Sequence, residues 1–447
     1  HIGVLKTLDS LGVKVDYISG TSMGAIVGSL YASGYSGKQL DSIFNHIDFE
    51  KLIGDDIPRA SKAFYERDNS EKYAVSIPFN NFKIQIPSAI SRGQNVFNLF
   101  SRLTMHVSDI DDFDNLPIPF FCIATNIETG KPVVLESGSL AQAIAASGAL
   151  PSLFQPVVIN DQILIDGGVV NNYPIDELRA KGMDIIIGVD VQDTSAGRVE
   201  LKSAPEILLQ INNFRTINDM KVKSVKTDIY IKPDITKFNV VSFNEGKQII
   251  KNGEIAALEL VNELNYISKR NESETKERTK ITPVDSIKIN DVTIKGNNKY
   301  TRSYILGKLK IKSGEKISYA DFEKGVNNLA ATNNFDSFLY KFIPSGDGHT
   351  LETELRESET TTFLKFGVHY DDLYKSAALA NLKKKRVLFN NDVASLDIIL
   401  GDNVRYNFDY YIDKGFYWSV GIKSRLNTFH KNISTSLLFP ENSAILD

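Results

Sequence analysis

The spacing of apolar residues changes twice along this chain, and these changes limit the folds open to it. Up to about residue 268, short apolar runs alternate with helical patterns, and the run over residues 184–191 is apolar on both faces. Strands of this kind are typical of parallel sheets that helices cover on both sides. With 447 residues, the chain is long enough for about three domains. We therefore predict an α/β domain over residues 1–268.

A polar segment separates this region from the next one. Residues 269–282 are almost entirely polar or charged and Pro283 follows them, as expected of a linker. Residues 283–357 then show a strand, two helices and two strands, with a capping box, Ser318-x-x-Asp321, at the start of the second helix. The order β-α-α-β-β predicts a small α+β domain.

The last segment, residues 358–447, has a period of two. Over residues 362–370, 394–401 and 405–412, apolar or aromatic side chains alternate with mainly polar ones. Such segments fit a transmembrane β-barrel, and a soluble antiparallel sheet packed on a core by one face has the same alternation. Four or five strands fit into this segment, whereas a membrane barrel needs about eight or more. We expect an incomplete barrel if the strands belong to one.

Composition excludes several classes of protein. The chain has 51 Lys and Arg against 55 Asp and Glu, and its net charge of −4 does not favour nucleic acid as a partner. Its single cysteine, Cys122, excludes an intramolecular disulfide, and no cluster of His, Cys and Asp has metal-ligand spacing. No apolar run reaches the roughly 18 residues of a transmembrane helix. We expect no metal, no cofactor and no nucleic acid.

The start of the chain is unusual. It begins at His1, and residues 4–11 have the apolar spacing of a helix without a capping residue before them. We expect that the chain opens inside a helix and that a preceding part has been removed.

Residues 20–24, Gly-Thr-Ser-Met-Gly, are a G-x-S-x-G motif. Residues 13–18 before it read as a strand, and residues 25–32 after it read as a helix. A serine between a strand and a helix in this motif is the pattern of a nucleophile elbow. A serine that caps a helix after a glycine-rich turn is the alternative interpretation.

The two interpretations assign different roles to the same residues. In an elbow, Gly20 and Gly24 let the backbone turn sharply, so that the Ser22 hydroxyl is exposed at the positive end of the helix. The Met23 N–H can then stabilise an oxyanion. Ser22 is thus the candidate nucleophile.

A serine nucleophile needs a base, and the sequence favours an aspartate over a histidine. None of the six histidines stands at the end of a strand in the α/β region, which argues against a Ser-His-Asp triad. Asp166 follows a strand pattern over residues 162–165 and precedes Gly167 and Gly168, which leave room for a close approach. An ordinary Asp-Gly turn is the alternative.

At these residues the sequence resembles the patatin-like phospholipases, hydrolases with a Ser-Asp dyad. The resemblance covers about residues 2–268 and includes residues 145–156, which are similar to the family's Ala-Ser-x-Ala-x-Pro-x-x-Phe segment. It implies a three-layer α/β fold with a mostly parallel sheet, Ser22 as the nucleophile and Asp166 as the base that takes its proton and then activates water. The family's glycine-rich oxyanion loop would precede Ile2, and this chain starts too late to contain it.

The later segments resemble a POTRA domain and an outer-membrane β-barrel of the assembly and translocation type, which occur fused to patatin domains in bacterial lipases. The resemblance implies a multidomain chain: a hydrolase domain over residues 1–268 that lacks its N-terminus, a linker over 269–282, a POTRA-like domain over 283–357 and a partial barrel over 358–447. It also implies the bacterial outer membrane as the location, with the hydrolase domain in the periplasm or at the cell surface.

Two functions follow from this reading. The first is a lipid acyl hydrolase that acts on phospholipid or another lipid ester and is anchored to the outer membrane or exported through it. The alternative is an outer-membrane assembly or translocation factor with the patatin domain as passenger or scaffold. For the hydrolase, we expect the Asp166 carboxylate within hydrogen-bond reach of the Ser22 hydroxyl and an apolar cleft beside them. We also allow for a homodimer.

Overall fold

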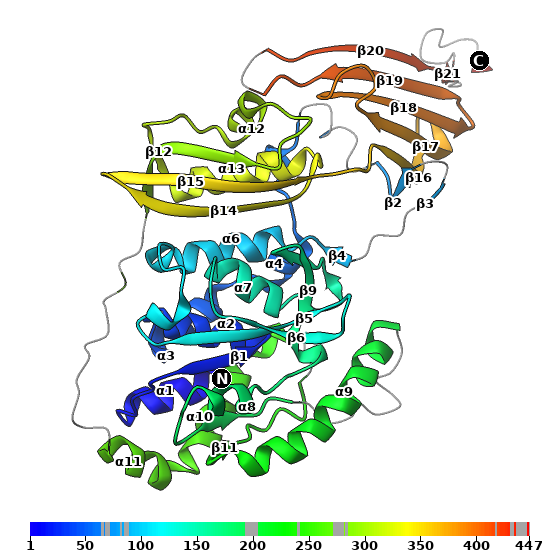
Figure 1. The fold of residues 1–447 in the computed structure, drawn as a ribbon. Coiled ribbons are helices and arrows are strands. Elements are labelled where there is room, and N and C mark those ends of the chain that lie inside the picture. Colours follow the sequence, from blue (N-terminus) through cyan, green and yellow to red (C-terminus); the bar gives the residue numbers. More distant parts are fainter. Residues whose placement is uncertain are drawn as a thin grey trace. The chain divides into compact units, whose positions relative to one another are not determined.

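The fold is that of a computed structural model (Figure 1), which describes residues 1–63, 67, 72–80, 83–84, 89–192, 204–238, 242–270, 281, 285–415, 418–429, 433–434 and 445–446. The chain forms two compact units. Unit 1 comprises His1–Asp56, Ser88–Val284 and Leu339–Glu352, and unit 2 comprises Ile57–Pro87, Asp285–Phe338 and Thr353–Asp447. The predicted linker over residues 269–282 lies mostly outside the described residues.

A five-stranded sheet forms the centre of unit 1. Its strand order is β1-β5-β9-β8, and β6 also pairs with β5. The strands are β1 (Ile18–Thr21), β5 (Phe120–Asn126), β6 (Lys131–Leu135), β8 (Val157–Ile159) and β9 (Gln162–Asp166). Two shorter parallel pairs accompany it: β4 (Ala89–Ser91) with β7 (Ser152–Phe154), and β10 (Ile187–Val189) with β11 (Ile229–Ile231).

This sheet corrects the expectation of a mostly parallel one. Strands β1 and β5 are parallel, whereas the pairs β5–β6, β5–β9 and β8–β9 are antiparallel. The connections explain the difference. Strands β8 and β9 are joined by the two-residue turn Asn160 and Asp161, both at positive φ, and β5 and β6 are joined by a short turn that ends at Gly130. Such short connections form hairpins, because a parallel pair needs a long crossover.

Helices cover the sheet of unit 1. Figure 1 shows α6 and α7 on one side of it and α8 and α10 on the other. The helices of this unit are α1 (Ile2–Ser10), α2 (Met23–Ala32), α3 (Gly37–His46), α4 (Phe49–Gly54), α6 (Gln94–Leu103), α7 (Leu140–Ser147), α8 (Ile175–Ala180), α9 (Ala204–Lys223), α10 (Gly246–Leu258) and α11 (Val261–Arg270). In the part of the chain that the structure describes, no helix is long and apolar enough to cross a membrane.

The strand before the G-x-S-x-G motif lies later than predicted. We expected it over residues 13–18, whereas β1 starts at Ile18 and runs to Thr21. The apolar side chain that suggested the earlier start, Val13, is buried among Leu8, Ile267 and other residues of α1, α10, α11 and β11. Val13 is therefore apolar because it packs in this cluster, and not because it belongs to a strand.

A four-stranded sheet with two helices follows in the chain. The strand order is β13-β12-β15-β14. The elements are β12 (Ser286–Lys295), α12 (Arg302–Leu309), β13 (Lys316–Ser318), α13 (Tyr319–Ala331), β14 (Phe335–Ser345) and β15 (Gly348–Glu357). The predicted order β-α-α-β-β is correct except for the short strand β13 between the helices. The capping residue is also as expected, because the Ser318 hydroxyl accepts a hydrogen bond from the Asp321 N–H at 3.0 Å.

The second sheet of unit 2 is antiparallel throughout, with the order β20-β19-β18-β17-β16-β2-β3. Its strands are β2 (Val75–Asn80), β3 (Lys83–Ile84), β16 (Thr362–Asp371), β17 (Lys375–Lys385), β18 (Asp392–Gly401), β19 (Arg405–Ile412) and β20 (Val420–Asn427). A further pair joins β21 (Ile433–Ser434) to β22 (Ile445–Leu446). Residues 57–87 were expected to belong to the hydrolase region, but their strand β2 pairs with β16 in this sheet.

Burial in strands β16 to β19 is the reverse of that in a soluble sheet. The apolar face is exposed: Val368 is 85% exposed, and Tyr370, Ile398 and Leu400 also face outward. The polar face is covered, and Asp397 is 1% exposed. A soluble sheet would bury its apolar face, whereas strands of a membrane barrel turn apolar side chains to the lipid and polar ones inward. The burial therefore favours the first strands of a membrane barrel over a soluble sheet.

Candidate active site

Ser22 stands between the end of β1 and the start of α2. Its backbone has φ 53° and ψ −121°, a positive-φ conformation that non-glycine residues rarely adopt unless the surroundings hold them there. The first helical hydrogen bond of α2 runs from the Ile26 N–H to the Ser22 carbonyl at 3.0 Å. Strand, strained serine and helix are thus arranged as a nucleophile elbow.

The first glycine of the motif is required by a close backbone approach. A Cβ atom on Gly20 would lie 2.4 Å from the carbonyl carbon of Gly24, far inside van der Waals contact. The strand and the first turn of α2 can therefore come this close only where residue 20 has no side chain. Met23 is the first residue of α2. The first N–H groups of a helix have no acceptor within the helix, and the Met23 N–H is one of them.

Asp166 ends strand β9 and faces the elbow. Its carboxylate is 3% exposed, and the Ser22 hydroxyl donates a hydrogen bond to Asp166 Oδ2 at 2.5 Å. Asp166 Oδ1 accepts a second hydrogen bond, from the Gly168 N–H, at 2.7 Å. Gly167 has to be a glycine, because a Cβ there would lie 2.1 Å from the Ile123 carbonyl oxygen.

Strand β5 is the element that brings Ser22 and Asp166 together. On one edge it pairs first with β1, with Gly20 opposite Cys122, and then with β9, with Asp166 opposite Ala124, while β6 occupies its other edge. Both strands therefore end at the same place on β5, although 144 residues separate the two side chains. The pairing of the strands thus positions the serine and the aspartate.

The electrostatics of Asp166 suit a base. Burial raises the pKa of its carboxyl from the ordinary value of 3.8 to about 6, although the hydrogen bonds from Ser22 and Gly168 oppose this rise. A carboxylate with a pKa close to the working pH accepts a proton more readily than an ordinary aspartate and is still ionised at neutral pH.

Ser147 is a residue of the site that the sequence analysis did not single out. Its hydroxyl accepts a hydrogen bond from the Ser22 N–H at 3.0 Å and donates one to the Ile123 carbonyl at 2.6 Å. Ser147 is fully buried at the end of α7. It connects the backbone of the elbow to β5. The signal that could have identified Ser147 in the sequence is its place in residues 145–156, the segment that resembles the family's Ala-Ser-x-Ala-x-Pro-x-x-Phe pattern.

The loop after Asp166 is held from two directions. From β1, the Thr21 hydroxyl donates to the Asn171 carbonyl at 2.9 Å. From α9, Lys223 Nζ donates to Asn171 Oδ1 at 2.6 Å and to the Tyr173 carbonyl at 2.8 Å. Burial lowers the pKa of Lys223. These contacts connect α9 to the loop that carries Gly167 and Gly168.

The histidines considered as bases form other contacts. His106 Nε2 lies 2.8 Å from the Ser33 carbonyl, and His46 Nδ1 lies 2.6 Å from the Ser42 carbonyl. Within the described residues, no group of three or more His, Cys, Asp and Glu side chains could hold a metal ion. Ser22 and Asp166, joined by a hydrogen bond, are the candidate catalytic pair of this site.

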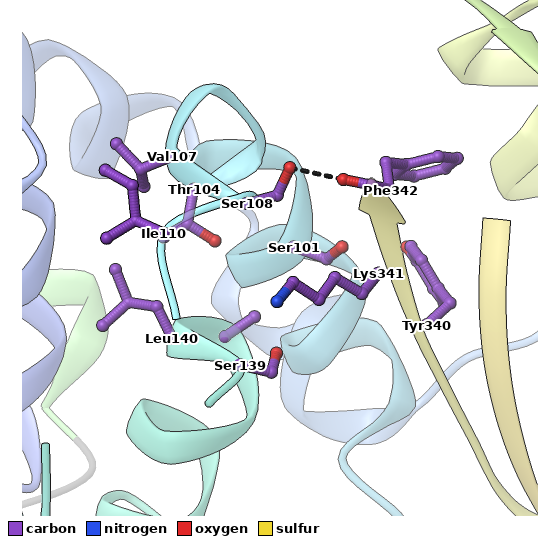
Figure 2. Close-up of a pocket in the computed structure, with 11 residues that line it drawn as sticks. Ser101, Thr104, Val107, Ser108, Ile110, Ser139, Leu140, Tyr340, Lys341 and Phe342 are labelled. Atoms are coloured by element: carbon purple, nitrogen blue, oxygen red, sulfur yellow. Dashed lines mark hydrogen bonds between the residues drawn. The ribbon is translucent and has the colours of Figure 1, made fainter. Parts of the chain in front are cut away.

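A pocket elsewhere in unit 1 is shown in Figure 2. It is lined by α6, by the turn after α6, by the start of α7 and by residues 340–342. The Ser108 hydroxyl donates to the Phe342 carbonyl at 2.6 Å on its wall. Neither Ser22 nor Asp166 lines this pocket. The apolar cleft expected beside Ser22 therefore stays a prediction.

The fold and this geometry define an α/β protein with a nucleophile elbow and a Ser-Asp pair. Comparison with family models agrees with this class: residues 1–179 match the patatin-like phospholipases. Residues 287–344 match the POTRA model, described as a surface antigen variable number repeat, and residues 349–446 match the OMP85 superfamily. The chain therefore carries a patatin-like domain, a POTRA domain and an OMP85-superfamily segment in this order.

Among curated proteins, similar relatives are fungal lysophospholipases. Lysophospholipase nte1 of Aspergillus fumigatus is 29% identical over 191 residues, which cover 43% of this chain and 11% of the relative. Lysophospholipase NTE1 of Pyricularia oryzae is 25% identical over 290 residues, which cover 59% of this chain and 18% of the relative. The chain thus matches less than a fifth of the length of either relative.

Two solved structures share weak similarity with the chain. CdiB from Acinetobacter baumannii is 12% identical, with a TM-score of 0.25, and the match covers 58% of this chain and 47% of CdiB. BamA from Haemophilus ducreyi lacking POTRA domains 1–3 is 14% identical, with a TM-score of 0.23, and covers 31% of this chain and 25% of that structure.

Proposed function

We propose that the chain is a serine acyl hydrolase that cleaves a carboxylic ester of a phospholipid or a related lipid, with Ser22 and Asp166 as its dyad. The observation that carries the proposal is the hydrogen bond of 2.5 Å from the hydroxyl of a strained elbow serine to a buried carboxylate. The match of residues 1–179 to the patatin-like phospholipases supports the lipid ester as substrate.

The first half of the proposed reaction forms an acyl-enzyme. Asp166 accepts the proton of Ser22 while Ser22 Oγ attacks the ester carbonyl carbon. The oxygen that becomes negatively charged receives a hydrogen bond from the Met23 N–H at the positive end of α2. The tetrahedral intermediate then expels the alcohol, a lysolipid when the substrate is a diacyl lipid, and Asp166 returns the proton to it.

In the second half, water replaces the alcohol. Asp166 takes a proton from a water molecule, the resulting hydroxide attacks the acyl carbon, and Ser22 leaves with the proton that Asp166 holds. Three glycines allow close approaches, Gly20 in the elbow and Gly167 and Gly168 behind the carboxylate, and Gly24 completes the elbow motif. Their roles in this scheme are part of the proposal.

The test is a lipid-ester assay on the full-length chain. We expect Ser22→Ala and Asp166→Asn each to reduce turnover by about 10⁴-fold or more, and the double variant to be hardly worse, because nucleophile and base act as one unit. Ser10→Ala and Asp161→Asn are matched controls at exposed positions and should keep full activity. Additive losses, or an equal loss when His46 or His106 is changed in a folded protein, would contradict the dyad.

The OMP85-superfamily segment supports a location at the bacterial outer membrane. The chain would be anchored there or exported, with the hydrolase domain in the periplasm or at the cell surface, and with domains close to residues 1–268, 283–357 and 358–447.

The alternative is an assembly or translocation factor in which the patatin-like domain is passenger or scaffold. The exposed apolar face of β16 to β19 favours a membrane role for that part of the chain. Loss of outer-membrane assembly or export in Ser22→Ala cells would not be expected under either function. Absence of lipid-ester hydrolysis by the wild type as well as by Ser22→Ala would favour the alternative, whereas full hydrolysis by Ser22→Ala would contradict the dyad. Homodimerisation stays a prediction.

A further inference from the structure

We propose that one side of α9 and the adjoining turn η5 (Ser224–Lys226) is a docking face for an anionic phospholipid bilayer. The docking face consists of Ile207, Phe214, Val222 and Val225. The proposal deepens the proposed function, on which it rests for the identity of the substrate, and it adds a route by which contact with a membrane reaches the catalytic loop.

The docking face is exposed to an unusual degree for large apolar side chains. The exposed fractions are 47% for Ile207, 54% for Phe214, 61% for Val222 and 86% for Val225. Figure 1 shows α9 at the margin of the elements that make up unit 1. Single exposed apolar residues need no explanation, but several on one element often mark an interaction site.

The spacing of these residues places them on one side of the helix. Ile207, Phe214 and Val222 are separated by seven and eight residues, which is close to two turns each time. Thr216 and Met220, on the other side, are buried against unit 1. The docking face therefore points away from the core, and Asn218 and Lys221 share it with the apolar side chains.

The charge around the docking face identifies the partner. Residues 204–226 contain Arg215, Lys221, Lys223 and Lys226 against Glu206 and Asp219. Two of these cations have carboxylate partners, Arg215 with Asp219 and Lys226 with Asp176. Lys223 is turned toward the catalytic loop, and Lys221 is exposed. Apolar side chains beside an exposed lysine, on a helix with more cations than anions, fit the interface of a bilayer with anionic headgroups, where the apolar groups enter the acyl boundary and Lys221 meets a phosphate.

The cations nearest the core connect the docking face to the active site. The Arg215 guanidinium donates to the Val170 carbonyl at 3.0 Å, and Lys223 binds Asn171 and Tyr173 in the same loop. This loop begins at Asp166 and is bonded at Asn171 to Thr21, the residue before Ser22. A bilayer bound at α9 would therefore be connected, through Arg215 and Lys223, to the loop that follows the base.

The first experiment measures docking directly and needs no catalysis. Cys122 is fully buried, so a cysteine introduced by Val225→Cys in the full-length chain can be labelled with a polarity-sensitive fluorophore. Vesicles of phosphatidylcholine with phosphatidylglycerol should shift its emission to the blue, and vesicles of phosphatidylcholine alone should do so less. The matched control is Ile255→Cys on α10, a position that is 48% exposed.

Two results would overturn the docking face. The first is a label at residue 225 that does not respond to the mixed vesicles, and the second is an equal response at residues 225 and 255. Because the label reports its own surroundings, binding of the vesicles through unit 2 does not imitate the expected result.

The second experiment links docking to hydrolysis. The double variant Phe214→Ser with Val222→Ser should hydrolyse phospholipid in mixed vesicles about tenfold more slowly, because two apolar anchors are lost. It should hydrolyse a dispersed short-chain ester at the wild-type rate. The control pair Ile255→Ser with Leu258→Ser, also exposed, should affect neither substrate. Lys221→Glu should slow hydrolysis in mixed vesicles and leave the dispersed ester unchanged.

The outcomes separate this proposal from the proposed function. An equal loss on both substrates would mean that α9 supports the fold rather than the membrane contact, and an unchanged rate on vesicles would mean that the docking face is not used; both overturn the proposal. If even the wild-type chain hydrolyses neither substrate, the proposed function fails, and the fluorescence of the label at residue 225 still decides the docking face.

Discussion

Strands β5 and β18 both lie inside sheets, yet they bury opposite kinds of side chain. Every residue of β5 is buried, and its first five, from Phe120 to Ala124, are apolar. In β18 the buried side chains include Ser395 and Asp397 together with Val393 and Ile399, while Ile398 and Leu400 are exposed. Unit 1 thus follows the rule for a protein in water, and this sheet of unit 2 follows the rule for a wall between lipid and a polar interior.

The two strands show that a buried aspartate can have different roles in the two units. Asp166, at the end of an apolar strand, has the Ser22 hydroxyl and one backbone N–H as hydrogen-bond donors. Asp397 belongs to a polar network in which the Tyr73 hydroxyl donates at 2.6 Å and the Asn381 amide at 2.5 Å. A carboxylate with a raised pKa in an apolar core is a candidate for function, whereas one on a polar wall among others is part of the architecture.

The largest effect is expected from a charge placed in β5. Ile123→Asp would leave an unpaired carboxylate in a fully buried position between β1 and β6, and we expect a cost of more than about 4 kcal/mol in the free energy of unfolding. Limited proteolysis and thermal unfolding should show that unit 1 is not folded. Ile127→Asp, at a half-exposed position just after β5, is the control and should be tolerated. A stable Ile123→Asp protein would contradict the claim that β5 lies in an apolar core.

The second prediction places a charge on the exposed face of β16. Val368→Lys should leave the protein in detergent unchanged but should cost up to about 2–4 kcal/mol of stability in a phosphatidylcholine bilayer, because the side chain would face lipid. His369→Lys, on the opposite face of the same strand, should cost less. Urea titration of both variants in detergent and in bilayers measures the difference. Equal effects at the two positions would show that this face does not meet lipid.

The third prediction concerns the stability cost of Asp166. The pKa of Asp166 in the folded state is about 6, above its ordinary value of 3.8, so its favourable contribution to stability is present below about pH 3.8 and is lost as the pH rises through 6. Asp166→Asn removes this loss and should be up to roughly 3 kcal/mol more stable than wild type at neutral pH. The difference should shrink between about pH 6 and pH 4 in denaturant titrations. A variant that is less stable at neutral pH would show that burial of the charged form is not costly.

The smallest expected effect is on the pH dependence of activity. If Asp166 is the base, kcat/KM should fall about tenfold for each pH unit below 6, because the protonated carboxyl cannot accept the proton of Ser22. The measurement is kcat/KM for a dispersed ester over the acid range, with circular dichroism to confirm that the protein stays folded. A profile without an inflection near this pH would separate Asp166 from the chemistry.

The candidate catalytic pair could be predicted from the sequence, because its signals are local. A G-x-S-x-G motif between a strand and a helix identifies Ser22, and an aspartate at the end of an apolar strand followed by two glycines identifies Asp166. The strands β16, β18 and β19 also carried a clear local signal, since their period of two repeats within each strand. Patterns of this kind depend on residues a few positions apart.

The tertiary structure decided what depends on residues far apart in the chain. Ser147 reaches the Ser22 N–H across 125 positions, and Lys223 reaches Asn171 across 52, so no local pattern announces either contact. The same holds for β2, which leaves the hydrolase region to pair with β16. The alternation in β18 also did not reveal which of its two faces is covered. A period of two shows that the faces differ in polarity, but it does not show whether each face meets water, lipid or protein. That choice is made by what packs against the strand, such as Tyr73 against Asp397.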